Sequence, residues 1–361
     1  MGRKEFNRRQ ALALGGAALA GAMGMSTLRS FADVVAQAKI EGSSEMAQGA
    51  KKDGKLRIGF SNGFSGNSWR TECLASLKKE AEKHKDIIEE LIIVDGQGDI
   101  AKQVNDIEDL IVQNVDAIMC IPNSGSAVIP VLRKATRAGI TTVPFNLPVE
   151  GGNYTAYVGV DPVTKGHQIS KFFNDTLGGK GKIVMLGGLP GNSYTAAIWE
   201  ATQKDLSKDI EVLAMKDTSW EEDRAKIVMA DLIAAHPQID GVWCDGGQVA
   251  CGAMKALLAA NRPLVPVTGD DYNGILKLYD AEKAKHDKFK ICMVSEPTWQ
   301  SVVALRTTLD LLAGKELPKY QLIGARRIDG DNYEEFIKRD LPDGVCVDTD
   351  LSDAELKTIF S

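Results

Sequence analysis

Short apolar runs alternate with longer amphipathic stretches along most of this chain, and this alternation constrains the fold more than any other feature. The first unit begins with an apolar run from Leu56 to Phe60, which fits a short buried strand. In the stretch that follows, Trp69, Cys73 and Leu77 recur every four residues, as on the buried face of an amphipathic helix. Strand–helix units repeated at this spacing predict an α/β protein with parallel sheets covered on both faces.

The units fall into two consecutive sets, which predict the domain organisation. The expected strands are residues 56–60, 91–94, 117–121 and 141–145 in the first set and 158–161, 183–186, 210–215, 242–244, 265–268 and 291–294 in the second. Two sets predict two hinged, Rossmann-like lobes with a cleft between them, and 361 residues suffice for about two domains. We expect residues 55–160 plus 296–325 to form the N-terminal lobe and residues 161–295 plus 326–361 the C-terminal lobe.

The N-terminal segment has the pattern of an export signal. Arg8 and Arg9 precede an apolar run, residues 11–25, that is too short and too rich in Gly and Ala to span a bilayer as a stable helix. The small-x-small pattern that ends at Ala32 then predicts cleavage there, so residues 1–32 are interpreted as a twin-arginine signal peptide. The alternatives are an ordinary Sec signal peptide and an N-terminal membrane anchor that is not cleaved. Residues 33–54 are polar and aperiodic, which predicts a flexible leader.

Composition narrows the functional class. A net charge of −6 argues against nucleic-acid binding, which requires a basic surface. The six cysteines form no C-x-x-C pair and lie in apolar patterns, which favours free thiols in a protein core, although one disulfide among Cys244, Cys251 and Cys292 stays open. The first cysteine is Cys73, so we expect no lipid anchor and a protein free in the periplasm. The four histidines suggest no metal cluster, and we expect no cofactor.

A dinucleotide fingerprint is present in form only. Gly96-x-Gly98 follows an expected strand and precedes an expected helix, as in nucleotide-binding folds. Asp95 and Asp99 flank these glycines and would repel a pyrophosphate, so we interpret the segment as a turn with Asp99 as a helix cap. No Gly-x-Ser-x-Gly nucleophile motif and no evident general base accompany the expected loops, which favours a binding protein over an enzyme.

Amides, carboxylates and aromatic residues gather in the loops after the expected strands. Ligands of open α/β sheets bind at these carboxyl ends. Sugars need this combination, because amides and carboxylates pair with adjacent hydroxyls and flat rings cover C–H faces. The candidate ligand-binding residues are Phe64, Asn67, Trp69, Arg70, Asn123, Asn146, Tyr194, Trp220, Asp245, Gln248, Asp271 and Glu296. Helix capping is the competing role for Asn123, Asn192 and Asp245.

From about Lys55 to its end, the chain resembles the type I sugar-binding periplasmic proteins of ABC transporters, the class that includes ribose-binding protein. The segments that carry the resemblance are residues 59–70, 121–127, 244–253 and 268–271. The resemblance implies lobes that close on a sugar or polyol by bending at three crossings, near Asp161, Ser295 and Ala325. It also implies a monomer that delivers its ligand to a membrane permease.

The same resemblance suggests roles for several residues. It places Asn67, Trp69 and Arg70 where the family has an asparagine followed by two stacking aromatic residues. Trp220 matches an aromatic residue of the second lobe. Asp271 matches a carboxylate that binds ligand hydroxyls, and Ser295 or Glu296 lies where a polar hinge residue contacts sugar.

Other positions depart from the ribose-binding pattern. An Asp-Arg pair is replaced by Asn146-Leu147, an expected arginine is absent near Ala196, and an expected amide is Gly246. These departures point to another pentose, a hexose or a polyol as ligand, with Arg70 supplying a guanidinium from a different direction. The alternatives are a sugar-sensing regulator or a chemoreceptor ligand protein of the same fold, or a Rossmann-type enzyme.

Overall fold

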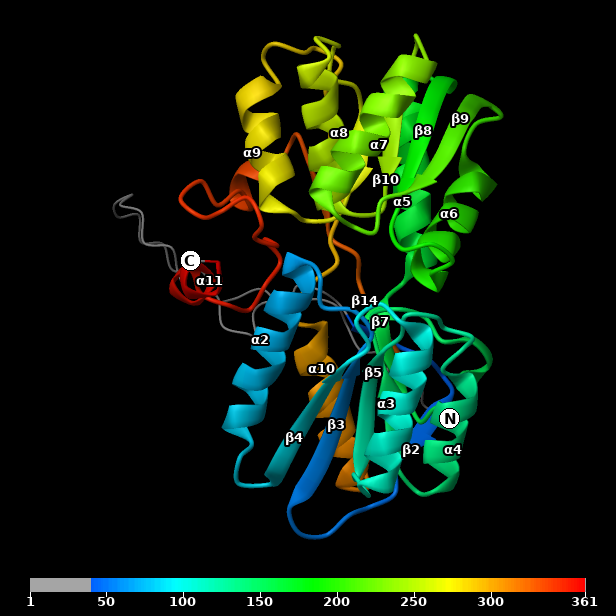
Figure 1. Ribbon diagram of the computed structural model, residues 1–361, viewed down its shortest axis with the longest axis vertical. Coiled ribbons are helices and arrows are strands. Elements are labelled where there is room, and N and C mark those ends of the chain that lie inside the picture. Colours follow the sequence, from blue (N-terminus) through cyan, green and yellow to red (C-terminus); the bar gives the residue numbers. More distant parts are fainter. Residues whose placement is uncertain (1–39, 361) are drawn as a thin grey trace, which may run out of the picture.

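The computed structural model describes residues 40–360, which form two α/β lobes joined at a narrow middle (Figure 1). The N-terminal lobe contains a parallel sheet of strand order β4-β3-β5-β6. Its strands are β3 (Leu56–Asn62), β4 (Ile88–Asp95), β5 (Ala117–Ile121) and β6 (Thr141–Pro144). Its helices are α2 (Ser68–Lys83), α3 (Ile100–Val112), α4 (Ile129–Arg137) and α10 (Gln300–Leu312), and a 3-10 turn (Glu150–Gly152) follows β6.

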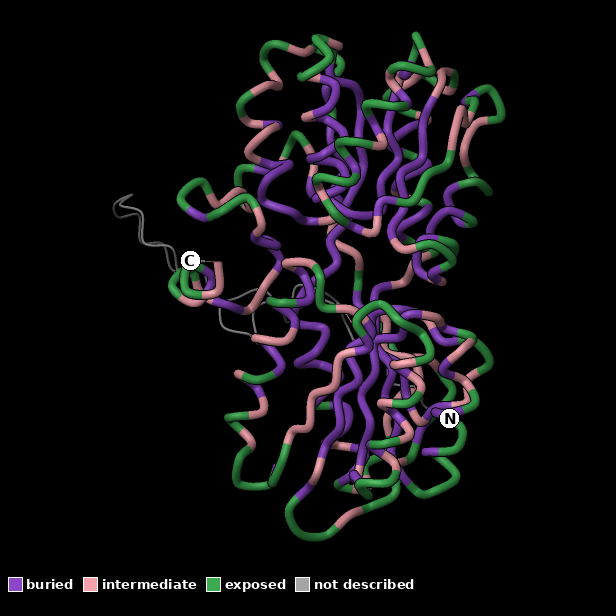
Figure 2. Tube along the Cα trace, viewed as in Figure 1, coloured by how far each residue is buried: buried purple, intermediate pink, exposed green. Residues whose placement is uncertain are grey.

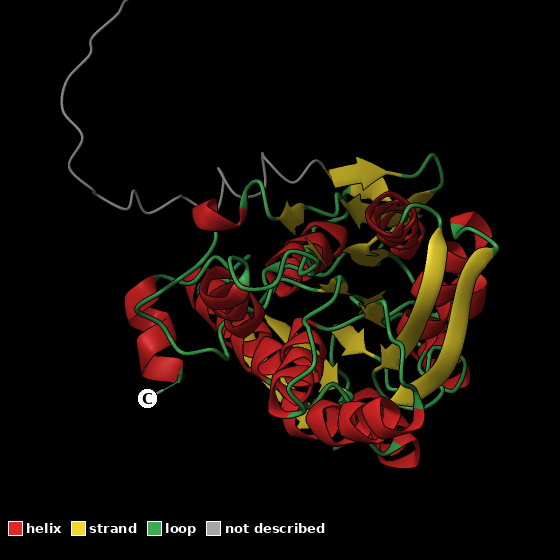
Figure 3. Cartoon of the chain, turned by 90° about the horizontal axis from the view of Figure 1, so that it is seen from above, coloured by secondary structure: helices red, strands yellow, loops and turns green. Residues whose placement is uncertain are grey.

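Strand β5 shows how the first sheet is covered on both faces. Met119 packs in the same core as Trp69 and Leu77 of α2. Its neighbours Ile118 and Cys120 point to the opposite face and pack with residues of α3 and α4. Because side chains alternate along a strand, a run that is apolar throughout satisfies both faces. The buried strands appear in purple in Figure 2, and Figure 3 shows strands enclosed between helices.

The C-terminal lobe contains a sheet of order β15-β12-β11-β10-β8-β9, parallel except at β15. Its strands are β8 (Lys180–Gly187), β9 (Asp209–Asp217), β10 (Gly241–Cys244), β11 (Val267–Gly269), β12 (Ile291–Val294) and β15 (Arg327–Asp329). Its helices are α5 (Pro162–Leu177), α6 (Ser193–Asp205), α7 (Glu222–Ala235), α8 (Gly247–Ala259) and α9 (Asn273–Glu282), with a later 3-10 turn (Tyr333–Glu335). The predicted two-lobe α/β fold with parallel sheets is confirmed.

The chain passes between the lobes at three places, each directly after a strand. Strand β7 (Tyr157–Val160) leads into α5, β12 leads into α10, and β14 (Tyr320–Ile323) leads into β15. These passages lie near Asp161, Ser295 and Ala325, the positions at which the sequence predicts crossings. All six cysteines are buried and free.

The segment expected to be a flexible leader contains secondary structure within its described part. Strand β1 (Ile40–Gly42) pairs with β14, and β2 (Met46–Gln48) pairs with β13 (Glu316–Pro318). Strands of three residues whose partners lie far along the chain leave no detectable period, so the sequence pattern missed them. The predicted signal peptide and residues 33–39 lie outside the described residues. Within residues 40–360, every helix is too short or too polar to cross a membrane.

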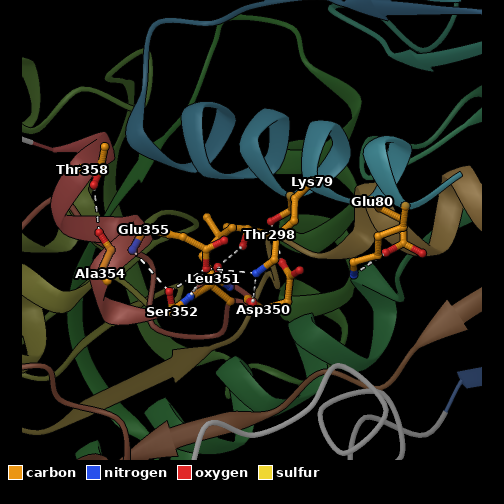
Figure 4. Close-up of polar contacts among 12 residues, drawn as sticks. Lys79, Glu80, Thr298, Asp350, Leu351, Ser352, Ala354, Glu355 and Thr358 are labelled. Atoms are coloured by element: carbon orange, nitrogen blue, oxygen red, sulfur yellow. Dashed lines mark hydrogen bonds and ion pairs between the residues drawn. The ribbon is translucent and has the colours of Figure 1, made fainter. Parts of the chain in front are cut away.

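Residues 341–360, here named the C-terminal strap, differ from the prediction that the end of the chain belongs to the C-terminal lobe. The strap follows the 3-10 turn, contacts the start of α9 through the bond from Asn273 N to the Val345 carbonyl, and crosses the hinge. It ends in α11 (Asp353–Ile359), which lies beside α2 of the N-terminal lobe (Figure 4). Lys79 Nζ donates to the Asp350 carbonyl at 3.2 Å and pairs with Glu355 at 3.0 Å. Leu356 is fully buried there. The strap is therefore a fourth connection between the lobes.

Candidate ligand-binding site

A cavity with an empty volume of about 360 Å³, including its opening to solvent, lies between the lobes. The residues that line it are Asn67, Trp69, Arg70, Asn146, Leu147, Tyr194, Trp220, Gln248, Asp270 and Glu296. They come from the carboxyl ends of strands in both sheets, where open α/β folds bind ligands. A wider groove lies at the amino ends of the C-terminal strands, but its lining comes from the C-terminal lobe alone.

The cavity brings together most of the predicted site residues. Those that line it are Asn67, Trp69, Arg70, Asn146, Tyr194, Trp220, Gln248 and Glu296, and those that lie outside its lining are Phe64, Asn123, Asp245 and Asp271. Leu147 and Asp270 line it without having been predicted. Asp270 is adjacent to the predicted Asp271. It directly follows strand β11, and this position at a strand's carboxyl end is the sequence signal that could have identified it as a cavity residue.

The N-terminus of α2 supplies one wall of the cavity. The Asn67 side-chain oxygen caps the helix by accepting from the backbone N–H of Arg70 at 3.0 Å, and Asn67 also lines the cavity. The indole N–H of Trp69 donates to the Glu296 carbonyl at 2.5 Å. This bond ties the ring to the second crossing, so its orientation depends on the hinge.

Arg70 is a buried cation that faces the cavity. One guanidinium nitrogen donates to Asn62 Oδ1 at 2.8 Å. Burial lowers the pKa of Arg70 to about 10, so the side chain is still charged at neutral pH. Within residues 40–360 it forms no ion pair closer than 4.0 Å. Among the described residues, its other guanidinium N–H groups have no hydrogen-bond acceptor, although the guanidinium lies 5.5 Å from the centroid of the Trp69 ring.

Trp220 supplies the opposite, C-terminal wall, and its position is fixed on several sides. Its backbone lies in the left-handed region at a φ of 55°, which is costly for a bulky residue and is typical of functional sites. Its ring lies against Gly188, where an added Cβ would come within 1.9 Å of the ring. The indole N–H donates to Asp245 at 3.1 Å, and the Gln248 amide donates to the Trp220 carbonyl at 3.2 Å.

The predicted carboxylates divide into a cavity group and supporting groups. Asp245 positions the site from behind, because its oxygens accept from Trp220 and from the Thr195 hydroxyl. Both oxygens of Asp271 accept backbone N–H groups, from Glu296 at 2.9 Å and from Asp348 at 2.7 Å. Asp271 therefore joins the second crossing to the strap, and Asp270 is the aspartate that lines the cavity.

Burial raises the pKa of each aspartate in this group. The pKa of Asp245 and that of Asp270 rise to about 6, although the charge of Lys165 acts in the opposite direction on both. The pKa of Asp271 rises to about 7, through burial and then through the charges of Asp348 and Asp270. The acceptor strength of this part of the site therefore changes near neutral pH.

Glu296 connects the two lobes at the base of the cavity. From the N-terminal lobe it accepts bonds from Asn146 at 2.8 Å and from Gln300 at 2.6 Å. From the C-terminal lobe it accepts the Tyr194 hydroxyl and lies 3.6 Å from the Lys165 ammonium. A carboxylate that serves both lobes links the cavity to their relative position.

Phe64 and Asn123 shape the first loop without lining the cavity. The Asn123 amide donates to the Gly63 carbonyl at 2.8 Å, and its backbone N–H donates to Gln103 at 2.8 Å. Phe64 is half-buried and its ring lies against Gly66, where an added Cβ would come within 2.3 Å of it. Neither Asn123 nor Asp245 caps a helix, whereas Asn192 caps α6 by accepting from Thr195 N at 2.8 Å.

The unused hydrogen-bonding capacity differs between the two walls. Among the described residues, the N-terminal wall retains donors on Arg70 and on the amide of Asn67, and one acceptor on the Asn146 side-chain oxygen. The C-terminal wall retains acceptors on Asp270, whose other oxygen accepts from Gly247 N, and on the Gln248 side-chain oxygen. Hydroxyl groups both donate and accept, so a polyhydroxylated molecule satisfies both walls. A molecule that only accepts, such as phosphate, satisfies one.

Two hinged α/β lobes that share such a cavity define a two-lobed solute-binding protein. The sequence profile of the family described as "Periplasmic binding protein domain" matches residues 58–316, and the chain belongs to this family. The strap and strands β1 and β2 lie outside the matched residues.

Relatives of the chain include proteins named for sugar and polyol binding. The ribose import binding protein RbsB of Bacillus subtilis is 28% identical over 72% of this chain and 84% of its own length. A xylitol-binding protein of Mycolicibacterium smegmatis is 34% identical over 50% of this chain and 53% of its own. An ABC transporter solute-binding protein from Mycobacterium smegmatis, solved with bound glycerol, is 26% identical with a TM-score of 0.70, covering 79% of this chain and 98% of that structure.

Proposed function

We propose that this protein is the periplasmic solute-binding component of an ABC importer and that it binds an uncharged monosaccharide or polyol between its lobes. One observation carries the proposal: Trp69 and Trp220, from opposite lobes, line a cavity with donors on one wall and acceptors on the other. Hydroxyl-bearing ligands satisfy both walls, and the rings cover their C–H faces. The names of the ribose and xylitol relatives support the same ligand class.

Charge balance within the site favours a neutral ligand. The positive charge of Arg70 is balanced by the carboxylate of Asp270 across the cavity. The negative charge of Glu296 is balanced by the ammonium of Lys165, which lies beneath the cavity. A sugar acid or an amino sugar would add a buried charge, and burying an uncompensated charge is costly. Closure of the lobes on the ligand is the expected response, because both lobes contribute to the lining.

A thermal-shift screen against pentoses, hexoses and polyols tests the proposal. A ligand at about 100 times its Kd stabilises the folded state by about 2.7 kcal/mol. The Trp220→Ala variant is expected to lose the shift while still unfolding cooperatively. The exposed Met215→Ala, in the strand before Trp220, is the control and is expected to keep it. A shift with a nucleotide, or turnover of any sugar, would contradict a transport binding protein.

Export and partners form the second part of the proposal. The mature protein begins after Ala32, is free in the periplasm as a monomer, and docks on an inner-membrane permease when closed. The family match to periplasmic binding proteins and the twin-arginine pattern at Arg8 and Arg9 support this. N-terminal sequencing of the exported protein is expected to start near Asp33. An intact Met1 in the cytoplasm would favour a regulator instead.

A further inference from the structure

A fully buried lysine lies beneath the cavity. Lys165, in the first turn of α5, has 0% of its side chain exposed. Its ammonium donates to the Tyr194 hydroxyl at 2.6 Å and lies 3.6 Å from a Glu296 oxygen. It does not line the cavity itself. Burying an ammonium is costly unless nearby groups compensate its charge, so its surroundings explain its presence.

Glu296 pairs with this lysine, and the lysine charge also lowers the pKa of Asp245 and of Asp270. Glu296 is at the second crossing, Asp245 follows β10 and Asp270 follows β11. Within residues 40–360, the Lys165–Glu296 contact is the only ion pair closer than 4.0 Å that any of these carboxylates forms. The other titratable groups that face the cluster are Tyr157, Tyr194, Cys244, Asp271, Cys292 and Cys346. None of those groups is a cation at any pH, and a further cation near the cluster is Arg70, which lines the cavity together with Asp270.

We propose that Lys165 is a positioning residue for ligand binding: it pairs with Glu296, and its charge keeps Asp270 ionised and therefore available to accept bonds from ligand hydroxyls. The inference rests on the proposed function of the cavity. Ionised acceptors form hydrogen bonds roughly twice as strong as neutral ones. Lys165 acts through these carboxylates, because its own ammonium is directed to Tyr194 and Glu296.

Replacing Lys165 by methionine, which is of similar length and uncharged, is expected to move the pH dependence of binding. Without the lysine charge, the pKa of Asp270 rises above its present value of about 6. Below that pKa the aspartate is protonated and binding weakens. The pH at which affinity is half its alkaline maximum is therefore expected to rise by about one unit, with affinity up to about tenfold lower near pH 6 and similar near pH 9. Calorimetric titration across pH measures this.

The ligand-free protein provides a second readout. A raised aspartate pKa means that the folded state holds more protons than the unfolded state, so stability falls as pH rises towards the folded pKa. In Lys165→Met the aspartate pKa is higher, so stability continues to fall up to a higher pH than in the wild type. The urea midpoint of the variant is expected to separate further from that of the wild type at pH 8 than at pH 5. Lys165→Gln, which is also uncharged, replaces it if the methionine variant does not fold.

Lys171→Met on the same helix is the matched control, because Lys171 is exposed and, within residues 40–360, its one ion pair is with Asp175. Its binding and stability curves are expected to follow the wild type at every pH. Loss of affinity by the same factor at every pH, or parallel urea midpoints, would show a merely structural role and overturn the inference. If the wild type binds no sugar or polyol but the urea midpoints separate as expected, the charge role stands and the proposed ligand class falls.

Discussion

Arg70 is a buried cation that lines the cavity, where a ligand can supply hydrogen bonds to it. In the structure it has lost hydration without gaining an ion pair among the described residues. Arg70→Met is therefore expected to cost about 1 kcal/mol or less of ligand-free stability, since loss of the bond to Asn62 and of the contact with the Trp69 ring is offset by removal of a buried charge. Ligand affinity is expected to fall about tenfold or more, because hydrogen bonds to charged groups contribute about 1.5–3 kcal/mol.

Urea denaturation and calorimetric titration separate these two effects. The exposed Arg133, which bonds Asn153 at 3.2 Å, supplies the control variant Arg133→Met, expected to change neither quantity. A large loss of ligand-free stability in Arg70→Met with unchanged affinity would place Arg70 in the framework of the lobe.

Gly188 is expected to act on the ligand through the ring of Trp220. A Cβ at this position would lie 1.9 Å from the ring, so Gly188→Ala must displace Trp220 from the cavity wall. Aromatic contacts contribute about 0.5–1.5 kcal/mol beyond their area. Affinity is expected to fall by about threefold to tenfold, and the fluorescence response to ligand is expected to decrease. An unchanged affinity would mean that Trp220 does not contact the ligand.

At the residue scale, the sequence placed the site loops but not every side chain within them. Loops at the ends of parallel strands follow from periodicity, and Asn67, Trp69 and Arg70 line the cavity as that argument suggests. Asp270 and Asp271 are adjacent, and which of them faces the cavity depends on backbone N–H groups of Glu296 and Asp348 that no pattern reveals.

The element whose behaviour is least evident from the fold family is α11. It has seven residues, too few to be stable alone, and begins with a capping box in which Ser352 and Glu355 bond reciprocally. Ser352→Ala is expected to cost about 1 kcal/mol of local stability. Amide hydrogen exchange within residues 353–359 is expected to accelerate, while that of α2 changes less. Lys357→Ala, exposed on the same helix, is the control. Equal protection in both variants would contradict the role of the cap.

The elements that were predicted and those that were missed differ in length and in the distance to their partners. Helices such as α5 and α10 bury long apolar stripes that a single sequence shows. Strand β1 has three residues, and Ile40 pairs with Ile323. Pairing over that separation depends on the assembled lobe, not on local pattern, and the same holds for the strap. Strand β1 and the strap, which depend on long-range contacts, also lie outside the residues that the family profile matches.

At the scale of the whole molecule, buried carboxylates meet at the hinge. Glu296, Asp271 and Asp348 connect the second crossing with the strap and both lobes. Opening the cleft must break or exchange some of these bonds. A ligand that bonds to Asp270 and Arg70 therefore changes the electrostatic balance at the place where the lobes move.

This balance predicts an acidic stability optimum for the ligand-free protein. The pKa values of Asp245, Asp270 and Asp271 are raised to about 6, 6 and 7. A raised aspartate pKa means that protons are held in the folded state, so these groups reduce stability as pH rises from their ordinary value of about 4 towards 7. Burial also acts on Glu80, but the bonds and charges of Arg306 and Lys83 outweigh it and lower its pKa to about 2.

Glu80 therefore contributes stability above its ordinary pKa of about 4.5, and that stability is lost as pH falls towards 2. The two effects together place the maximum near pH 5. A sugar or polyol that donates hydroxyls to Asp270 favours its ionised form and is expected to move this maximum upward by about one unit. Urea denaturation at a series of pH values, with and without ligand, measures both maxima. A ligand-free stability maximum at pH 8 would contradict buried carboxylates with raised pKa values at the hinge. A maximum that a bound ligand does not move would show that the ligand forms no hydrogen bond to Asp270.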